Sequence, residues 1–473
     1  MFEFLEEKHS NHPKGGDILK ESLTIKDMEK IVVVGAGLVG SLHAILMAQK
    51  GFKVEVYERR PDMREIELQG GRSINLALST RGWKAIQMAG IAEQIEDISI
   101  PMTGRLMHSL EGELTYQAYG KEGEAIYSVS RGELNKRLLL EASKHENVSF
   151  YFNHKCEDLD INSNTLHFTD TQSGAAKEVK ADRIFGTDGA FSAVRTRLMK
   201  TDRFNFSQQY LKHGYKELLL PANPDGTHQI EKKALHIWPR GEFMLIALPN
   251  DDGSYTCTLF FPYDGKYSFN SLQTEDQVNH FFKETFPDFY NLMPNVAEEY
   301  FQNPTSSLVI IRCEPWNHSD KILLMGDSSH AIVPFYGQGM NSGFEDCSVF
   351  SEMFDQYNGD WSKVFPEFAK TRKPDGDAIA DLALQNYIEM RDLVGDEMFL
   401  LRKKIEKKIF DKYPDQWMPL YSQVTFSHIR YSEALAAGKR QEKIMDEVME
   451  MPDIRSKWDS EEVEQKILSS FAR

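Results

Sequence analysis

Residues 31–40 read Ile-Val-Val-Val-Gly-Ala-Gly-Leu-Val-Gly, a short apolar run that leads directly into a glycine-rich turn. The apolar run predicts a buried strand, and the helical spacing of residues 38–50 predicts the helix that follows. In the pattern Gly35-x-Gly37-x-x-Gly40, the first glycine permits a tight turn and the second lets a pyrophosphate approach the backbone. The third lets the helix pack closely on the strand. The stretch therefore predicts a dinucleotide site at a helix N-terminus, where free N–H groups attract phosphate.

The next residues complete a strand–helix–strand unit. Residues 53–57 alternate between polar and apolar side chains, as a second strand does, and Glu58 comes directly after them. A carboxylate at this position is expected to bind a ribose hydroxyl. Arg59 beside it is a candidate contact to a 2′-phosphate, although an ordinary surface arginine explains it equally well.

A second glycine motif, residues 326–341, follows another apolar run at 322–325. Its Asp327 is expected to accept hydrogen bonds from a ribityl chain. The backbone N–H groups of Gly339–Asn341 are expected to face the pyrimidine edge of a flavin. Two such motifs, separated by most of the chain, predict a large cofactor that is held at both ends, and FAD fits that description.

A third turn, Asp188-Gly189, follows the strand-like residues 183–186. Asp188 is a candidate cofactor contact, and the alternative is a plain Asp-Gly turn capped by Ser192. The chain has no second Gly-x-Gly-x-x-Gly unit after a strand. A pyridine nucleotide is therefore expected to bind transiently, without a domain of its own.

The composition limits the partners and the compartment. The chain has 473 residues and a net charge of −17, which argues against nucleic acid or an anionic membrane as a general partner. Its four cysteines lack metal-ligand spacing, so we expect free thiols and no metal site. No apolar run reaches the ~18–20 residues that a membrane-spanning helix needs, and the first residues do not resemble a signal peptide. We therefore expect a cytoplasmic protein.

The order of strand-like and helix-like segments predicts an α/β fold (α+β overall). Residues 28–205 and 305–375 are expected to form a discontinuous Rossmann-like FAD-binding domain, and residues 206–304 an inserted antiparallel β-sheet domain for the substrate. Residues 376–473 are expected to be helical, and residues 1–27 to form a flexible tail. Within the helical region, the basic residues 402–408 favour a solvated helix face over a membrane contact.

Taken in order, Gly35–Gly40, Asp188-Gly189 and Gly326-Asp327 resemble the motifs of the single-component FAD-dependent aromatic hydroxylases. Further stretches narrow the resemblance to the branch of this family that hydroxylates L-kynurenine: residues 71–79, 213–218, 234–239, 334–341, 345–346, 386–390 and 421–426. The resemblance covers about residues 30–442. It implies tightly but non-covalently bound FAD, NADPH as a transient co-substrate, and O2.

The resemblance also assigns residues to the substrate site. A clamp for the substrate carboxylate falls on Arg105 and Tyr119, and Asn386 and Tyr421 close the pocket from the C-terminal helices. A guanidinium with a phenol donor suits a carboxylate. The apolar ring pocket falls on Leu218, Met244, Ile246 and Phe260, with ordinary core positions as the alternative for Leu218 and Ile246. The substrate ring is expected to be positioned by Pro334, Phe335, Tyr336 and Gln338.

The expected cofactor contacts combine the motifs above with positions that the resemblance adds. They are Gly35, Gly37, Leu38, Gly40, Glu58, Arg59, Arg131, Asp188, Asp327, Gly339, Met340 and Asn341.

The reaction implied by the resemblance belongs to tryptophan catabolism. NADPH reduces FAD, O2 forms a flavin C4a-hydroperoxide, and one oxygen atom is transferred to the ring carbon ortho to the amino group, which gives 3-hydroxy-L-kynurenine. Because the amino group already makes that carbon nucleophilic, no side chain is expected to act as an acid or base. His330 is expected to make a structural hydrogen bond.

The sequence departs from the family in two places and leaves two alternatives open. Tyr336 stands where relatives usually have Phe or His, and residues 449–473 are charged where eukaryotic relatives have a membrane anchor. One alternative is a hydroxylase of a phenolic acid, and the other is a flavin-free escort protein of the same fold. A monomer or a homodimer is expected.

Overall fold

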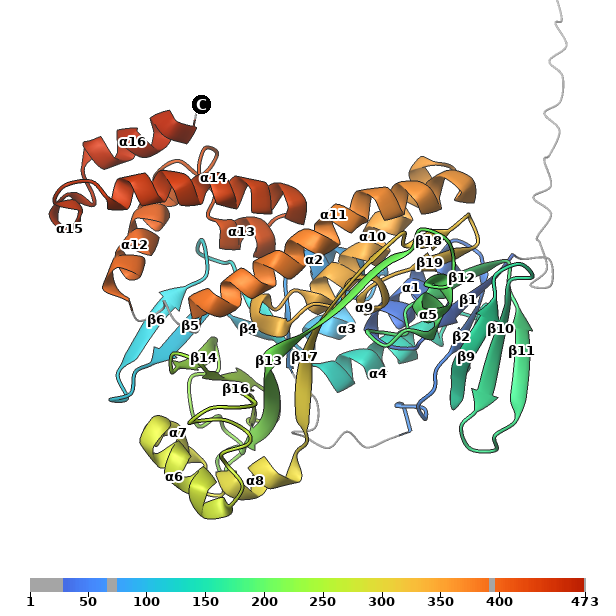
Figure 1. Cartoon of the computed structure of the whole chain (residues 1–473), viewed down its shortest axis with the longest axis horizontal. Helices are drawn as coiled ribbons and strands as arrows, with labels where there is room; N and C mark the ends of the chain where they lie inside the picture. Colours follow the sequence, from blue (N-terminus) through green and yellow to red (C-terminus); the bar gives the residue numbers. More distant parts are fainter. Residues whose placement is uncertain (1–28, 66–74, 391–395, 472–473) are drawn as a thin grey trace, which may run out of the picture.

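The computed structural model describes residues 29–65, 75–390 and 396–471. The predicted tail at 1–27 lies outside these residues. A six-stranded sheet forms the centre of the first part of the molecule, in the order β18-β19-β12-β1-β2-β8 (Figure 1). Its strands are β1 (Lys30–Val34), β2 (Lys53–Tyr57), β8 (Val148–Tyr151), β12 (Arg183–Gly186), β18 (Asn317–His318) and β19 (Ile322–Leu324). All are parallel except the edge strand β18.

Helices and two small sheets surround this parallel sheet. Ile31, Val32 and Val33 are fully buried, as expected for a strand that is covered on both faces. The helices are α1 (Leu38–Gln49), α2 (Thr80–Met88), α3 (Ala92–Glu96), α4 (Arg131–Ala142), α5 (Ala193–Leu198), α9 (Asp327–His330) and α10 (Gly339–Gln356). The small sheets are β3 (Asn75–Leu78), β7 (Ile126–Ser130) and β4 (Ile100–Met102), and β9 (His154–Asp160), β10 (Thr165–Asp170) and β11 (Ala176–Lys180).

The second large sheet has seven strands in the order β17-β13-β16-β15-β14-β5-β6. They are β5 (Gly104–His108), β6 (Leu114–Ala118), β13 (Asn205–Leu220), β14 (Ala234–Pro239), β15 (Met244–Pro249), β16 (Tyr255–Pro262) and β17 (Thr305–Glu314). The pairing is antiparallel except between β14 and β5. β5, β6 and β17 come from outside residues 206–304. The sheet therefore crosses the domain limits predicted from the sequence, which stay a prediction.

The two faces of this sheet bury two different cores, because successive side chains of a strand point to opposite sides. One face packs against α6 (Glu275–Thr285), α7 (Pro287–Leu292) and α8 (Val296–Gln302) (Figure 1). The other face packs against η2 (Pro334–Tyr336) and the C-terminal helices. This second face carries most of the candidate substrate-binding residues.

The C-terminal part is helical. It contains α11 (Trp361–Ile388), α12 (Glu397–Lys412), α13 (Leu420–Thr425), α14 (Tyr431–Met449), α15 (Ile454–Lys457) and α16 (Glu461–Phe471). α11 runs unbroken across the predicted limit at residue 375. Among the helices of the described ranges, none is long and apolar enough to cross a membrane.

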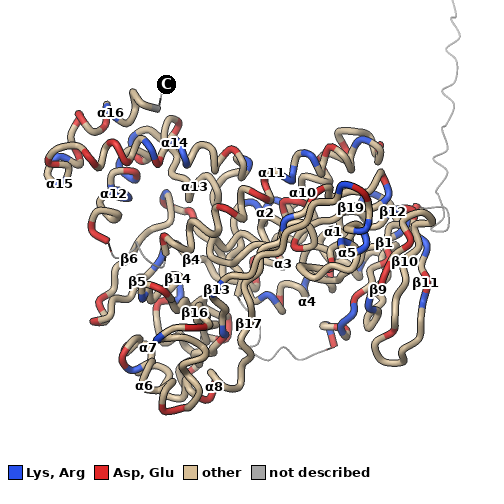
Figure 2. The backbone as a smooth tube through the Cα atoms, in the orientation of Figure 1, with Lys and Arg blue, Asp and Glu red and all other residues tan. Residues whose placement is uncertain are grey.

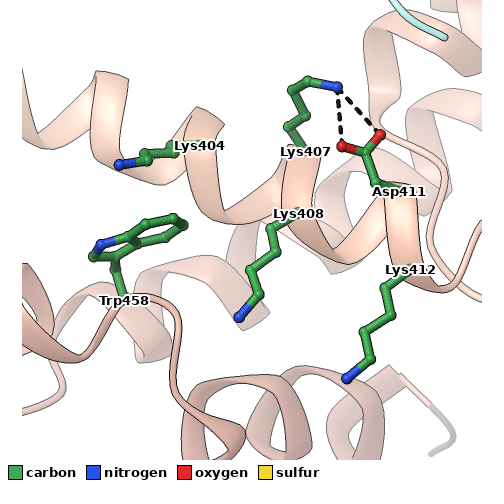
Figure 3. Close-up of a pocket in the computed structure, with 6 residues that line it drawn as sticks. All are labelled: Lys404, Lys407, Lys408, Asp411, Lys412 and Trp458. Atoms are coloured by element: carbon green, nitrogen blue, oxygen red, sulfur yellow. Dashed lines mark hydrogen bonds and ion pairs between the residues drawn. The ribbon is translucent and has the colours of Figure 1, made fainter.

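The basic residues of α12 lie among acidic and aromatic partners (Figures 2 and 3). The Lys407 Nζ lies 3.0 Å from an Asp411 carboxylate oxygen, and the Lys412 Nζ 2.6 Å from one of Glu464. Lys404 lies over the Trp458 ring, 3.8 Å from its centroid. These contacts fit the solvated helix face that the sequence favours.

Candidate active site

The three glycines of the first motif have three different environments. Gly35 has a φ of +101°, and a Cβ there would lie 2.7 Å from the Thr187 carbonyl oxygen. A Cβ on Gly40 would lie 2.0 Å from the Gly35 carbonyl oxygen, so α1 packs against this turn only with glycine. A Cβ on Gly37 meets no protein atom within 4 Å. The turn is therefore closed at Gly35 and Gly40 and open at Gly37, where the N-terminus of α1 has no side-chain cap and no acidic residue.

Glu58 directly follows β2 and is a buried carboxylate. One oxygen accepts a hydrogen bond from the Ala36 N–H (2.9 Å), and the other accepts from the N–H (3.0 Å) and Nε (2.8 Å) of Arg60. Burial alone would raise the pKa of Glu58, but the hydrogen bonds and charge of Arg60 hold it below its ordinary value. Both arginines are exposed, and Arg60 is the one whose side chain binds Glu58. Arg59 was the candidate cofactor contact from the sequence, and that role stays a prediction.

Asn341 joins the second motif to the strand β3. Its side chain is fully buried, and Oδ1 accepts a hydrogen bond from the Ser79 N–H at 2.8 Å. Its Nδ2 donates to the carbonyls of Ala77 and Gly337, both at 2.8 Å. Gly337 is left-handed, with a φ of +66°. The side chain therefore fixes the start of α10 and leaves the backbone N–H groups of its first turn, which contains no acidic residue, for a ligand.

Three further cofactor candidates are Asp327, Arg131 and Asp188. Asp327 lies at the start of α9, where desolvation raises the pKa of its carboxyl and the charge of Arg131, at the start of α4, partly offsets this rise. Asp188 accepts hydrogen bonds from the Ser192 hydroxyl (2.5 Å) and the Ala193 N–H (2.7 Å). These are contacts of the Asp-Gly turn with Ser192 that the sequence left open as the alternative. A contact of Asp188 with a cofactor stays a prediction.

Arg105, Tyr119 and Tyr421 come together from β5, the end of β6 and α13. The Arg105 guanidinium lies 4.6 Å from the centroid of the Tyr421 ring and 5.2 Å from that of Tyr119. The two rings are stacked at 5.3 Å. The Arg105 Nε and the Tyr119 hydroxyl are buried, and neither has a hydrogen-bond partner of normal geometry among the described residues. A half-buried cation with a buried, unpaired Nε–H is suited to an anionic ligand, because leaving such a donor unpaired is costly.

The Tyr119 hydroxyl is protonated and can donate a hydrogen bond. Burial raises the pKa of Tyr119 well above its ordinary value, because the phenolate is poorly solvated there. The hydroxyl thus keeps its proton at neutral pH. Burial raises the pKa of Tyr336 for the same reason. The Tyr336 ring stacks on that of Tyr421, with 5.6 Å between the ring centroids.

Asn386 connects α11 to the loop beside this clamp. Its Nδ2 donates to the Phe335 carbonyl at 2.7 Å. Phe335 in turn lies 4.8 Å from the Phe260 ring, centroid to centroid. Gln338 points elsewhere: its Oε1 accepts a hydrogen bond from the Tyr431 hydroxyl at 2.9 Å, and its Nε2 lies 3.4 Å from the Ser79 hydroxyl. Pro334 is exposed.

Comparison with known proteins decides the family. A family model described as an FAD binding domain matches residues 28–360. The chain is 51% identical to kynurenine 3-monooxygenase of Flavobacterium johnsoniae, over 93% of this chain and 98% of that protein. It is 44% identical to kynurenine 3-monooxygenase of Sus scrofa, over 88% of each chain. The chain belongs to the kynurenine 3-monooxygenase family.

The fold is also that of a solved oxygenase. The tetrameric form of 2-methyl-3-hydroxypyridine-5-carboxylic acid oxygenase superposes with a TM-score of 0.64 at 17% identity, over 78% of this chain and 94% of that one. The α/β fold with an FAD-binding domain and a helical C-terminal region is confirmed. In the described ranges, no group of three or more His, Cys, Asp or Glu residues is arranged to hold a metal ion.

The structure brings most of the apolar candidates of this kynurenine 3-monooxygenase family member together. Met244 and Phe260 are buried in one cluster with Tyr119, Phe335 and Tyr336, and Ile246 packs against it. Leu218 does not join them. It is buried in the core under α6–α8, because it lies three positions along β13 from Tyr215, whose ring faces the clamp cluster. Leu218 thus takes the ordinary core position that the sequence left open.

Sequence reasoning named only some of the apolar residues of this cluster. Met102, Leu235 and Ile237 are buried in the same cluster as Met244 and Phe260. The period-two alternation of β14 was the available signal for two of them, because Trp238 on the same strand faces the opposite core.

Proposed function

We propose that this protein hydroxylates L-kynurenine to 3-hydroxy-L-kynurenine, with FAD as cofactor and NADPH and O2 as co-substrates. The observation that carries the choice of substrate is the Arg105–Tyr119–Tyr421 clamp. It offers a half-buried positive charge with a buried, unpaired Nε–H beside an apolar cluster. An aromatic amino acid has the matching parts, a carboxylate for the clamp and a ring for the cluster.

The residues around the two glycine motifs fit FAD. The open space at Gly37 would admit the pyrophosphate, and Glu58 would accept from a ribose hydroxyl. The free N–H groups at the start of α10 would hold the pyrimidine edge of the flavin. Bound FAD would supply the electron transfer and the oxygen activation of the reaction.

The protein's own part is to bind, orient and exclude water. Arg105 and the protonated Tyr119 hold the carboxylate at one end of the substrate, which positions its ring at the apolar cluster. Met244, Phe260 and Phe335 surround the ring with apolar surface that excludes water. Tyr336 lies on the same aromatic stack as the clamp, so its ring limits how the substrate can tilt.

No side chain is needed as a general base, because the ring carbon ortho to the amino group is already nucleophilic. The geometry of His330 agrees with this view. The histidine is buried, its Nε2 lies 2.6 Å from a carboxylate oxygen of Asp346, and its ring stacks on Trp316. We infer that His330 is structural.

A substrate screen tests the proposal. Kynurenine is expected to accelerate NADPH oxidation by the purified yellow protein and to yield 3-hydroxykynurenine. Phenolic acids such as 4-hydroxybenzoate are expected to do neither, and the opposite pattern would favour the phenolic-acid hydroxylase. A colourless protein that gains no flavin absorbance on incubation with FAD would favour the escort protein.

Two finer expectations stay proposals. We propose a cytoplasmic location and a monomer or homodimer in solution. Cell fractionation and analytical ultracentrifugation measure them directly.

A further inference from the structure

A fully buried arginine lies between the FAD-binding domain and the C-terminal helices. Arg81, on α2, has no side-chain exposure. Its Nε donates to the Val424 carbonyl at 2.8 Å, and its Nη2 donates to the carbonyls of Gln423 (3.1 Å) and Ile429. One side chain therefore binds the backbone of a segment that is more than 340 positions away in the sequence.

These carbonyls belong to the end of α13 and the loop after it. α13 has only six residues, and a helix of that length is not stable without outside contacts. The last carbonyls of a helix lack partners within it and carry partial negative charge. Arg81 supplies both the donors and the positive charge. The placement of α13 thus depends on this guanidinium.

α13 carries Tyr421, which completes the proposed carboxylate clamp. The Tyr421 ring lies against the Arg105 guanidinium and between the rings of Tyr119 and Tyr336. Tyr421 is the third residue before Val424, which accepts from Arg81. A shift of α13 would therefore move the Tyr421 ring away from Arg105.

The other side of Arg81 is tied to the second glycine motif. Its Nη1 donates to Glu345 of α10 at 2.5 Å, and Glu345 also accepts from Arg372 of α11 at 2.7 Å. The Arg372 Nε donates to Asp346 at 2.9 Å, and Asp346 accepts from the Gly326 N–H at 2.9 Å. A buried ion network thus runs from the second glycine motif (residues 326–341), which is proposed to hold the flavin, to α13, which carries Tyr421.

A second connection runs in parallel. The Arg81 guanidinium lies 4.0 Å from the centroid of the Tyr431 ring, and the Tyr431 hydroxyl donates to Gln338 at 2.9 Å. Gln338 immediately precedes α10. Arg81 therefore contacts both α13 and Tyr431 of α14, and Tyr431 in turn binds Gln338 of the second glycine motif.

We propose that Arg81 is a positioning residue that sets Tyr421 against Arg105 and so completes the substrate clamp. The inference rests on the proposed function. It assigns to Arg81 an effect on substrate binding that passes through Tyr421, in addition to any effect on folding.

A double-mutant cycle tests this coupling. The dissociation constant for kynurenine is measured on the FAD-loaded enzyme by perturbation of the flavin absorbance. Arg81→Lys keeps the charge but loses the fork of donors, and it is expected to raise the constant on the order of tenfold. In a Tyr421→Ala background, the same substitution is expected to change it less than about twofold. A tenfold effect in both backgrounds would overturn the proposal.

Arg240→Lys is the matched control. Arg240 also donates to several backbone carbonyls, including those of Thr285 and His108, but it lies outside the network. It is expected to lower the melting temperature without changing kynurenine binding. An equal loss of binding in this control would mean that general loosening explains the effect, and would overturn the proposal.

If Arg81→Lys does not fold, Glu345→Gln takes its place in the cycle, because it removes the anionic partner of Arg81 and keeps its shape. The same non-additivity with Tyr421→Ala is expected, and additivity would again overturn the proposal. Wild-type enzyme that makes no 3-hydroxykynurenine would instead count against the proposed function.

Discussion

At the scale of single residues, Arg105 is the group on which substrate binding depends most. Its Nε has no hydrogen-bond partner among the described residues, and its guanidinium lies against the rings of Tyr119 and Tyr421. Arg105→Ala is expected to raise the KM for kynurenine about 10- to 100-fold, because the substrate carboxylate would be left unpaired in an apolar site. Steady-state kinetics measures this effect. The KM of Arg105→Lys should lie between those of the wild type and the alanine variant. An unchanged KM in the alanine variant would remove Arg105 from the site.

His330 is expected to matter for cofactor retention and not for ring chemistry. It holds Asp346, which accepts the Gly326 N–H at the start of the second glycine motif. His330→Ala should therefore weaken FAD binding by about tenfold, the size of one charge-assisted hydrogen bond. FAD content after gel filtration and product formed per bound FAD separate the two effects. Full FAD occupancy with lost hydroxylation would show that His330 takes part in the chemistry.

At the scale of elements, the turn between β1 and α1 offers a matched pair of substitutions. A Cβ at Gly37 meets no protein atom within 4 Å, whereas a Cβ at Gly40 would lie 2.0 Å from the Gly35 carbonyl oxygen. Gly37→Ala should leave the stability of the FAD-free protein unchanged and weaken FAD binding by about tenfold or more, because the methyl group occupies the pyrophosphate space. Gly40→Ala should destabilise the protein itself.

Thermal unfolding of FAD-free protein and titration with FAD measure the two quantities. Equal FAD affinity in Gly37→Ala and wild type would show that the cofactor does not pass this glycine.

The elements also show what the sequence could and could not predict. The strand–glycine–helix unit at residues 30–50 was predictable, because its signals are local and each glycine has a steric cause. The side of the sheet that Leu218 faces was not, since a run of three leucines has no period-two alternation to read. The roles of Asp188 and Arg60 depended on side-chain rotamers that local pattern does not specify.

At the scale of the whole molecule, the long-range contacts were beyond the sequence. Nothing near Arg81 indicates that it binds carbonyls at residues 423–429, and a buried ion network has no periodicity. The joining of β5 and β6 to the seven-stranded sheet was also hidden, because parallel pairing of β5 with β14 links segments about 130 residues apart. The candidate clamp was accessible only through family resemblance, since Arg105 comes from β5, Tyr119 from the residue after β6, and Tyr421 from α13.

The stability of the whole molecule should depend on pH through His43. This side chain is fully buried between Phe185 and Phe350, and both ring nitrogens lack hydrogen-bond partners among the described residues. Burial lowers its pKa from 6.5 to about 3, although the charge of Asp346 opposes the shift. Below pH 6.5 the unfolded state binds a proton that the folded state does not. The free energy of unfolding should therefore fall by about 1.4 kcal/mol per pH unit from pH 6.5 towards pH 3 on account of this group.

Urea unfolding of the FAD-loaded enzyme at pH 7.0, 6.0 and 5.0 measures the slope. His43→Leu should reduce it, because the titrating group is gone. His280→Gln is the control, since His280 is largely exposed, and it should leave the slope unchanged. The same slope in His43→Leu and wild type would assign the acid sensitivity to other groups.

The central claim is that one oxygen atom of O2 is inserted into kynurenine at the carbon ortho to its amino group. The most direct measurement is mass spectrometry of the product formed from kynurenine and NADPH by the FAD-loaded enzyme under 18O2. The account predicts 3-hydroxykynurenine that carries one 18O atom, formed in step with NADPH oxidation. Unchanged kynurenine, or a hydroxyl group derived from water, would contradict it.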